Sequence, residues 1–224
     1  MTNELSTSVN FDDKLKWVLV QFNESHIPYA IGGALALGYY VLEPRATHDI
    51  DINVFARIDH ADDVLDLLSE HVNITVEQKS KLLIDEQIRL FWEDTPLDIF
   101  FMNLDLHQRM RDKVQLREYA GIPIPILSVT HLVTCKAIFN RNKDWVDIDT
   151  VLAHPDLDKA EVTNSIVEIC GKKSPQYRIW NQVTSSPVSM TYEDFQMLSL
   201  KKIAESSHTS RTTRSIQHLG NEKK

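Results

Sequence analysis

The chain has 224 residues, of which 42% are hydrophobic and 25% charged, a composition that is ordinary for a globular protein of one domain with a small addition. Its formal charge of −8 gives no overall attraction to nucleic acid, although a local basic groove can coexist with an acidic average. No apolar run has the length of a membrane span, and the first residues lack a targeting pattern, so a cytoplasmic protein without a membrane partner is expected. Cys135 and Cys170 are expected as reduced, buried thiols.

The first half of the chain alternates between helical and strand patterns. Apolar residues recur at helical spacing in some segments, and short apolar runs bounded by turn residues predict strands in others. In chain order, the predicted elements are a helix (11–25), a strand (28–31), a helix (33–43), a strand (49–55), a helix (59–68), a hairpin (88–92 and 97–101) and short strands within 114–127. This order predicts an α/β core over residues 1–127.

The second half of the chain is helical by the same criteria. Apolar spacing predicts three helices (128–139, 144–152 and 158–170) and a further amphipathic stretch (191–204). We therefore predict a helical region over residues 128–204. Residues 205–224 are rich in Ser, Thr, Arg and Lys and lack apolar periodicity, which predicts a disordered tail that is either only solvated or in contact with RNA.

Asp49 and Asp51 occupy alternate positions of the strand predicted over 49–55. Alternate residues of a strand point to one face, roughly 7 Å apart. Ile50 and Ile52 take the other, buried face. Carboxylates held on one face repel each other, and a divalent cation beside them removes that repulsion. The pair therefore predicts a metal site, with solvated acids on an edge strand as the alternative.

Gly32 and Gly33 lie between the first predicted strand and the next helix. Free backbone N–H groups at such a turn suit a phosphate, although the pair alone also fits a simple helix entry. Asp98 lies in the second strand of the predicted hairpin, where it is either a third metal-facing carboxylate or an exposed acid near the turn. Three such acids can hold two divalent ions for an in-line phosphoryl transfer. The sequence contains no closely spaced pair of histidines of the kind that binds zinc, so a zinc site is not expected.

This order of motifs resembles the nucleotidyltransferase superfamily related to polymerase beta. Its pattern is Gly-Gly or Gly-Ser, about a dozen residues, Asp-x-Asp, and a later Asp. The run from Arg45 to Asp51 is similar to the bacterial AbiEii-type toxins and, more loosely, to lincosamide nucleotidyltransferases. Lys136 and residues 141–147 look like a later helical motif of the family. The resemblance covers residues 27–152 and implies a small mixed β-sheet with flanking helices.

The resemblance also implies roles for individual residues. Asp49 and Asp51 would ligate two Mg²⁺ ions and the phosphates of an NTP. Asp98 would complete the catalytic metal site and help to deprotonate the acceptor. Gly32 and Gly33 would hold the β- and γ-phosphates through backbone N–H groups.

Two cations complete the implied nucleotide site. Lys136 would neutralise the triphosphate, and the alternative for it is a surface lysine of a helix. Arg45 would act in the same way or stabilise the leaving pyrophosphate. Arg141, Asp144 and Asp147 fit either the family motif or a charge network between helices.

The implied activity is transfer of a nucleoside monophosphate from an NTP to an acceptor hydroxyl, with release of pyrophosphate. The toxin-like resemblance implies a tRNA as acceptor and a cognate antitoxin as partner. The resistance enzymes imply a small molecule of the aminoglycoside or lincosamide type. A non-catalytic nucleotide-binding module on the same fold is the alternative from another class.

Overall fold

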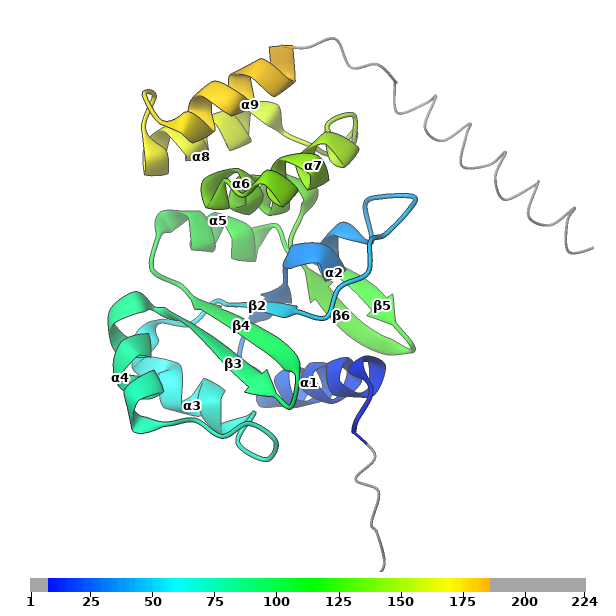
Figure 1. The fold of residues 1–224 in the computed structure, drawn as a ribbon, viewed down its shortest axis with the longest axis vertical. Coiled ribbons are helices and arrows are strands. Elements are labelled where there is room, and N and C mark those ends of the chain that lie inside the picture. Colours follow the sequence, from blue (N-terminus) through cyan, green and yellow to red (C-terminus); the bar gives the residue numbers. More distant parts are fainter. Residues whose placement is uncertain (1–7, 186–224) are drawn as a thin grey trace, which may run out of the picture.

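The computed structural model describes residues 8–185 of the chain. These residues form a six-stranded mixed β-sheet with helices on both faces (Figure 1), which confirms the predicted mixed α/β class. The elements are α1 (Phe11–Ser25), β1 (Tyr29–Ile31), α2 (Gly33–Leu37), β2 (Ile50–Val54), the 3₁₀ turn η1 (Ile58–His60), α3 (Ala61–Asp66), α4 (Val76–Asp85), β3 (Gln87–Trp92), β4 (Thr95–Phe101), α5 (Asp105–Asp112), β5 (Gln115–Tyr119), β6 (Ile122–Ile126), α6 (Val129–Phe139), α7 (Asn142–Val151), α8 (Lys159–Cys170) and α9 (Pro175–Ser185).

The strand order of the sheet is β3-β4-β2-β1-β6-β5. β2 is parallel to β4 and β1 is parallel to β6, whereas the other neighbouring strands are antiparallel. Burial alternates strictly along β4, and Ile50, Ile52 and Ile99 of β2 and β4 are fully buried on one face. Because side chains alternate along a strand, Asp51 and Asp98 project from the opposite face.

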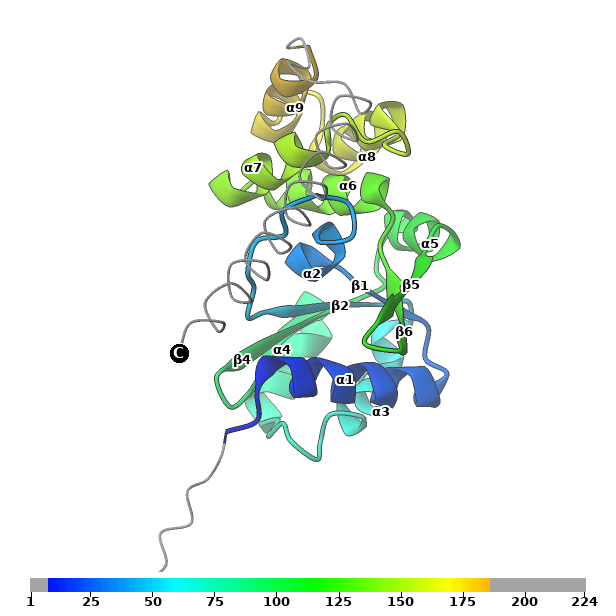
Figure 2. The ribbon, with the colours of Figure 1, turned by 90° about the vertical axis from the view of Figure 1, so that its right-hand side faces the viewer.

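The two faces of the sheet carry different layers. α1 and α3 lie against one face, and α2 lies against the other, with α5 to α9 beyond it (Figures 1 and 2). α6 joins this outer layer to the core, since it packs against α2, α7 and α8. Its sequence is apolar on every side, as is typical of a helix that is buried all round. The candidate site lies between the sheet and α6.

A buried lysine fixes the hairpin that carries Asp98. Lys14 of α1 is 1% exposed, and its ammonium group lies at the turn between β3 and β4. Its Nζ donates to the Asp94 carboxylate at 3.0 Å, the Thr95 hydroxyl at 3.1 Å and the Trp92 carbonyl at 3.2 Å, and lies 3.0 Å from the Glu93 carboxylate. The hairpin is therefore anchored to α1 at its tip.

The sequence analysis missed three helices and overestimated one. The helix predicted over 33–43 is wrong in length, because α2 ends at Leu37 and Gly38 begins a tighter turn. The Tyr40 hydroxyl donates to the Leu127 carbonyl at 2.8 Å, which draws the chain toward the end of β6. α4, α5 and α9 were not predicted, since each is short and buries only one or two side chains.

The other predicted elements are present within a few residues of their expected ends. The amphipathic stretch 191–204 and the tail 205–224 lie outside the described residues. Within residues 8–185, no helix has the length and apolar character needed to cross a membrane. Cys135 and Cys170 are free and half-buried, and burial raises the pKa of the Cys135 thiol to about 12.

Candidate active site

Three side chains form a row across β2, β4 and β3. Asp51 is paired in register with Asp98 across the parallel strands, and Asp98 is paired in register with Arg89 across the hairpin. Neighbouring strands lie about 4.8 Å apart, so each side chain reaches the next one. Asp49 precedes β2 by one residue, and the strand period places it on the same face. We refer to Asp51, Asp98 and Arg89 as the carboxylate row.

Asp51 is the most perturbed acid of the row. Burial, followed by the negative charges of Asp98 and Asp49, raises the pKa of Asp51 to about 6. Lys136 and Arg141 act in the opposite direction without cancelling this effect. The repulsion expected between these carboxylates is therefore present in the structure, and an added cation would relieve it.

Asp98 is neutralised by Arg89 in this conformation. Nε of Arg89 donates to Oδ1 of Asp98 at 2.7 Å, and Nη2 donates to Oδ2 at 2.5 Å. Both carboxylate oxygens are thus engaged by one guanidinium, whose pKa is raised by Asp98. The alternative prediction, in which Asp98 is an exposed acid near the turn, is wrong, since its side chain is only 14% exposed.

Gly33 sits directly over the Asp51 carboxylate. Its φ of +55° lies in the left-handed region that favours glycine, and a Cβ built on it would lie 1.8 Å from Oδ2 of Asp51. The N–H of Gly32 donates to the Asp51 carbonyl at 2.8 Å, which ties the turn to β2. A Cβ on Gly32 would lie 2.7 Å from Nδ2 of Asn53. The glycine pair therefore permits close approach of a backbone turn to the acids.

The two predicted cations meet at one aspartate. Lys136 is buried, and its Nζ donates to Oδ2 of Asp147 at 2.7 Å. Arg45 binds the same carboxylate through two hydrogen bonds of 3.0 Å. The surface-lysine alternative for Lys136 is wrong, because its side chain is 5% exposed. Asp147 holds both cations on the side of the site nearest Gly33.

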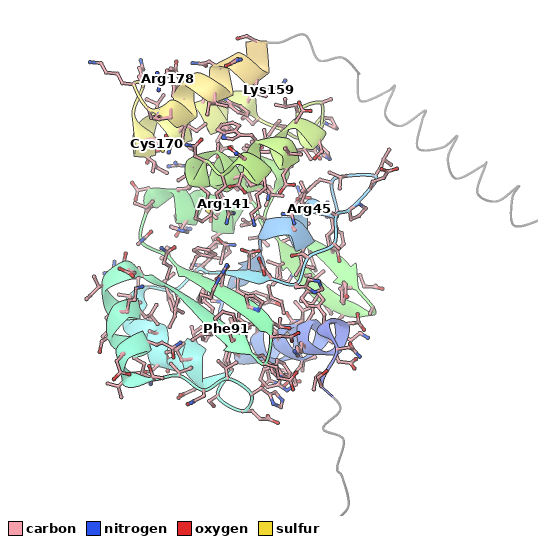
Figure 3. All side chains as sticks on the ribbon, viewed as in Figure 1. Arg45, Phe91, Arg141, Lys159, Cys170 and Arg178 are labelled. Atoms are coloured by element: carbon pink, nitrogen blue, oxygen red, sulfur yellow. The ribbon has the colours of Figure 1, made fainter. Side chains whose placement is uncertain are left out.

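A second acid of α7 holds a third cation. Asp144 is fully buried, and Arg141 donates to its two oxygens at 2.7 and 3.1 Å. Asp144 and Asp147 are three residues apart, so they lie on one face of α7. The Arg141 guanidinium also lies 5.1 Å from the centre of the Phe139 ring. We call Arg45, Lys136, Arg141, Asp144 and Asp147 the α7 ion-pair cluster; Figure 3 shows Arg45 and Arg141 between the sheet and the helical layer.

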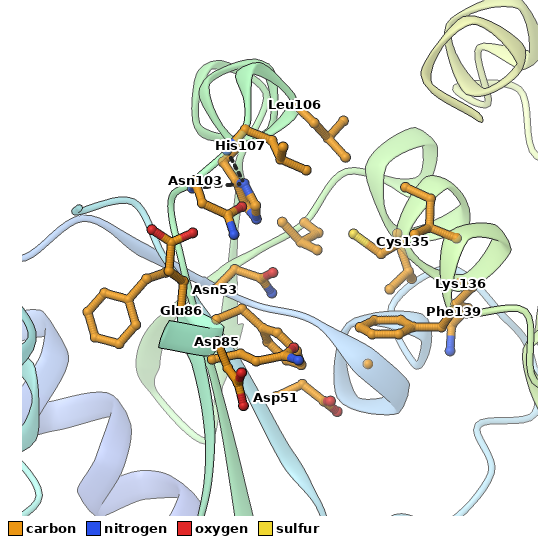
Figure 4. Close-up of a pocket in the computed structure, with 18 of the residues that line it drawn as sticks. Asp51, Asn53, Asp85, Glu86, Asn103, Leu106, His107, Cys135, Lys136 and Phe139 are labelled. Atoms are coloured by element: carbon orange, nitrogen blue, oxygen red, sulfur yellow. Dashed lines mark hydrogen bonds between the residues drawn. The ribbon is translucent and has the colours of Figure 1, made fainter. Parts of the chain in front are cut away.

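Two adjoining cavities open beside Asp51. A mostly apolar cavity of about 180 Å³ extends under α6 and α5, where Asp51 and Asn53 face Cys135 and Phe139 (Figure 4). Gly33 and Lys136 also line it. A more polar cavity of about 410 Å³ extends toward β3 and α4. It is lined by Asp51, Gln78, Lys81, Asp85, Gln87, Ile88, Arg89, Asp98, Phe100, Phe139 and Arg141. Asp51 therefore separates two spaces of different chemistry.

The carboxylates fit a magnesium site by chemistry, although they do not converge here. Carboxylate oxygens are the ligands that Mg²⁺ prefers in proteins. In the part of the chain that the structure describes, no group of three His, Cys, Asp or Glu side chains is gathered closely enough to hold an ion. In this conformation, Asp98 directs both of its oxygens at Arg89. Asp51 and Asp98 are neighbours across the strands, and the strand period places Asp49 on the same face.

The sequence analysis did not identify Arg89 or Asn53 as site residues, and it left Asp147 undecided. Arg89 had a usable signal, because a two-residue turn at Glu93 and Asp94 pairs residues whose numbers sum to 187, which places Arg89 opposite Asp98. Asn53 is the next residue after Asp51 on the same face of β2, and it is buried. Both positions therefore follow from strand register once the turn is known.

No known protein family and no curated protein matches this chain. Similar solved structures include a Thermotoga maritima protein assigned as a nucleotidyltransferase, at 17% identity over 60% of this chain and 87% of that one, with a TM-score of 0.42. An antigenic nucleotidyltransferase-like protein from Paracoccidioides brasiliensis is 11% identical over 77% and 92% of the chains, with a TM-score of 0.45. ANT(2″)-Ia in complex with adenylyl-2″-tobramycin is 12% identical over 76% and 97%, with a TM-score of 0.45. These similarities do not confirm the resemblance to AbiEii-type toxins, and they are distant, so the chemistry proposed below rests on this chain's own residues.

Proposed function

We propose that this protein is a Mg²⁺-dependent nucleotidyltransferase that moves a nucleoside monophosphate from an NTP to an acceptor hydroxyl. The observation that carries the proposal is the register of Asp51 with Asp98 beneath Gly33. It combines acids whose repulsion favours a bound cation with a backbone turn that approaches them closely. A structural ion pair would need neither the Asp51 pKa of about 6 nor the bare glycine.

The acids divide the work of the site between them. Asp49 and Asp51 would hold the metal ions and the oxygens of the transferred phosphoryl group. Asp98 would bind the metal on the acceptor side and help to remove the proton from the attacking hydroxyl. Two Mg²⁺ ions at these carboxylates would stabilise the charge that develops on the attacking and leaving oxygens.

The turn and the cations would receive the donor nucleotide. Gly33 offers a backbone N–H group beside Asp51, where the β- and γ-phosphates would lie, whereas the N–H of Gly32 is already bound to the Asp51 carbonyl and holds the turn in place. Lys136 lines the same cavity as Gly33, and Arg45 shares its carboxylate partner. These cations are paired with Asp147 in the structure, so the incoming phosphates would share them with that carboxylate.

The acceptor is the finer part of the proposal. The resemblance to AbiEii-type toxins favours the end of a tRNA, with a cognate antitoxin as partner. The resemblance to resistance enzymes favours a small aminoglycoside or lincosamide. Both kinds of acceptor would supply a hydroxyl to the same reaction. The donor nucleotide is therefore identified first, and acceptors are then screened with it.

The first experiment is isothermal titration of each NTP with and without Mg²⁺. It compares the wild type with Asp49→Ala/Asp51→Ala, and the control Asp59→Ala/Asp63→Ala removes two acids whose side chains are 70% and 69% exposed. We expect Mg²⁺-dependent binding of one or more NTPs that only the Asp49/Asp51 variant loses. Absence of NTP binding by the wild type would contradict the proposal.

A second step tests turnover with the nucleotide that binds. Pyrophosphate release is followed in the presence of total tRNA and of aminoglycoside and lincosamide drugs. We expect release with one acceptor class, lowered at least about a thousandfold in the Asp49/Asp51 variant, because the carboxylates act in the transition state. Tight NTP binding without release for any acceptor would favour the non-catalytic module.

A further inference from the structure

Arg89 is a charged side chain of the site to which the proposed reaction gives no role. It lies at the outer end of the carboxylate row, on the edge strand β3. Its side chain is 51% exposed, yet it makes a two-point contact with Asp98 at 2.5 and 2.7 Å. A half-exposed guanidinium has little need of such a partner for folding, since exposed ion pairs contribute little to stability.

Asp98 stands between two competing partners. On one side, Asp51 lies in register on β2, and an ion shared by the two acids would lie between the strands. On the other side, Arg89 lies in register on β3 and takes both oxygens. While that contact holds, the carboxylates do not gather into a group that could hold a metal within residues 8–185. The Asp98 carboxylate can therefore bind either Arg89 or a metal ion that it shares with Asp51.

We propose that Arg89 is a latch that keeps Asp98 from the metal site until the metal and nucleotide arrive together. The inference rests on the proposed function, because it regulates the same site. In the latched state, the guanidinium takes the place of a cation beside Asp98. A metal ion alone must displace it, whereas an ion carried by an NTP brings additional contacts to Gly33 and Lys136.

A cavity beside Arg89 can receive its guanidinium group once the contact with Asp98 is broken. Arg89 lines the polar cavity of about 410 Å³ together with Gln78 and Asp85 of α4, and the Asp85 carboxylate is an alternative partner for a guanidinium. A side chain at the edge of the sheet can swing into this space without disturbing the core. Arg89 therefore changes partner rather than leaving the site, and it is a positioning residue that acts through Asp98.

A permanent supporting role for Arg89 predicts the opposite result. A carboxylate has about four lone-pair positions, so Asp98 can in principle bind a guanidinium and a metal at once. In that case, Arg89 would orient Asp98 for the metal, and its removal would weaken metal binding. In the latch, its removal strengthens metal binding, since a competing cation is lost. The sign of the change separates the two roles.

The test measures Mn²⁺ affinity without turnover, by electron paramagnetic resonance of free Mn²⁺ and by titration calorimetry. Arg89→Gln is expected to bind Mn²⁺ about fivefold more tightly than the wild type, the scale of a lost charge-assisted pair at a half-exposed site. Arg89→Lys keeps the charge but loses the two-point contact, and its affinity should fall between the two. Lys81→Gln removes a cation of the same cavity and should leave Mn²⁺ affinity within about twofold of wild type.

Further measurements test whether the change in Mn²⁺ affinity arises from the contact between Arg89 and Asp98. A non-hydrolysable NTP should tighten Mn²⁺ binding more in the wild type than in Arg89→Gln, because only the wild type has a latch to open. Unchanged or weaker Mn²⁺ binding by Arg89→Gln, with Asp98→Asn still weakening it, would overturn the latch and leave the proposed function standing. If Asp98→Asn binds Mn²⁺ as tightly as the wild type does when the non-hydrolysable NTP is present and the latch is open, Asp98 is no metal ligand, and both proposals fall.

Discussion

The carboxylate row and the α7 ion-pair cluster lie on two sides of one site, and they treat buried charge differently. In the cluster, burial alone would raise the pKa of Asp147, but hydrogen bonds from Arg45 and Lys136 hold it below its usual value. In the row, burial and neighbouring acids raise the pKa of Asp51 to about 6. The formal charges, +1 for the cluster and −1 for the row, are equal in size. The difference is that hydrogen-bonded cations flank Asp144 and Asp147, whereas Asp51 faces two other acids.

This difference separates acids that stabilise the fold from acids that would take part in the reaction. A buried ion pair with complete partners sets the positions of helices and seldom reacts. An acid held in an unfavourable environment stabilises whatever cation arrives, at the cost of stability before it arrives. We therefore expect substitutions of the cluster's acids, Asp144 and Asp147, to act mainly on folding, and substitutions of the acids in the row to act on ligand binding while sparing or raising stability.

The largest effect on folding is expected from Asp147→Asn. This change leaves Lys136 buried without its counter-charge and releases Arg45, which should lower the free energy of unfolding by about 3 kcal/mol. Urea unfolding measures the loss. The matched control is Asp94→Asn, which removes one partner of the buried Lys14, but from a side chain that is 92% exposed. It should cost under about 1 kcal/mol. Equal losses would contradict the contrast between buried and exposed pairing.

Much of the site's framework could be predicted from the sequence, because it depends on local periodicity. Strand alternation predicted that Asp49 and Asp51 share one face, and the hairpin signal placed Asp98 in a strand. That this strand lies beside β2 comes from the structure. The acids are therefore adjacent. Their proposed roles in metal binding and catalysis stay predictions.

The pairing of the charges could not be predicted in the same way. Arg45 and Asp147 are 102 residues apart, and no local pattern says which carboxylate a distant guanidinium will reach. Arg89 differs, because the length of a hairpin turn fixes its register and hence the contact with Asp98. Sequence periodicity thus supplies faces and registers, whereas long-range ion pairs depend on how whole helices pack.

The pH dependence of stability gives a second, smaller test of the row. The pKa of Asp51 in the folded protein, about 6, lies above the ordinary value of 3.8 for an aspartate. The unfolded chain therefore loses this proton first, and Asp51 lowers the stability of the fold as pH rises from about 4 to 6. Asp51→Asn has no such proton. Relative to the wild type, this variant should gain stability through that window, reaching about 2 kcal/mol near pH 7.

Urea unfolding in EDTA at pH 4, 5, 6 and 7 measures this difference, and other titrating groups cancel between the two proteins. Asp59→Asn, an exposed acid on η1, should show a flat difference across the same range. A flat difference for Asp51→Asn as well would mean that the row carries no unbalanced charge, which would remove the contrast with the cluster.

The smallest expected effect concerns the close contact between Gly33 and Asp51 rather than the charge of the row. Gly33 and Gly121 both have a positive φ, +55° and +83°, but an added Cβ meets no described atom within 4 Å at Gly121 and lies 1.8 Å from Oδ2 of Asp51 at Gly33. Alanine at either position should lose about 1 kcal/mol to backbone strain. Gly33→Ala should lose about 1 kcal/mol more, since the carboxylate must move.

A double-mutant cycle assigns this additional loss to its cause. In an Asp51→Ala background, most of the extra loss at Gly33 should disappear, because the carboxylate that the new Cβ meets is gone. Gly121→Ala should lose the same amount in both backgrounds, as it is remote from the row. If the extra loss at Gly33 persists without the Asp51 carboxylate, the bare glycine serves the turn itself. The close approach of Gly33 to Asp51 would then give no reason to place a phosphate there.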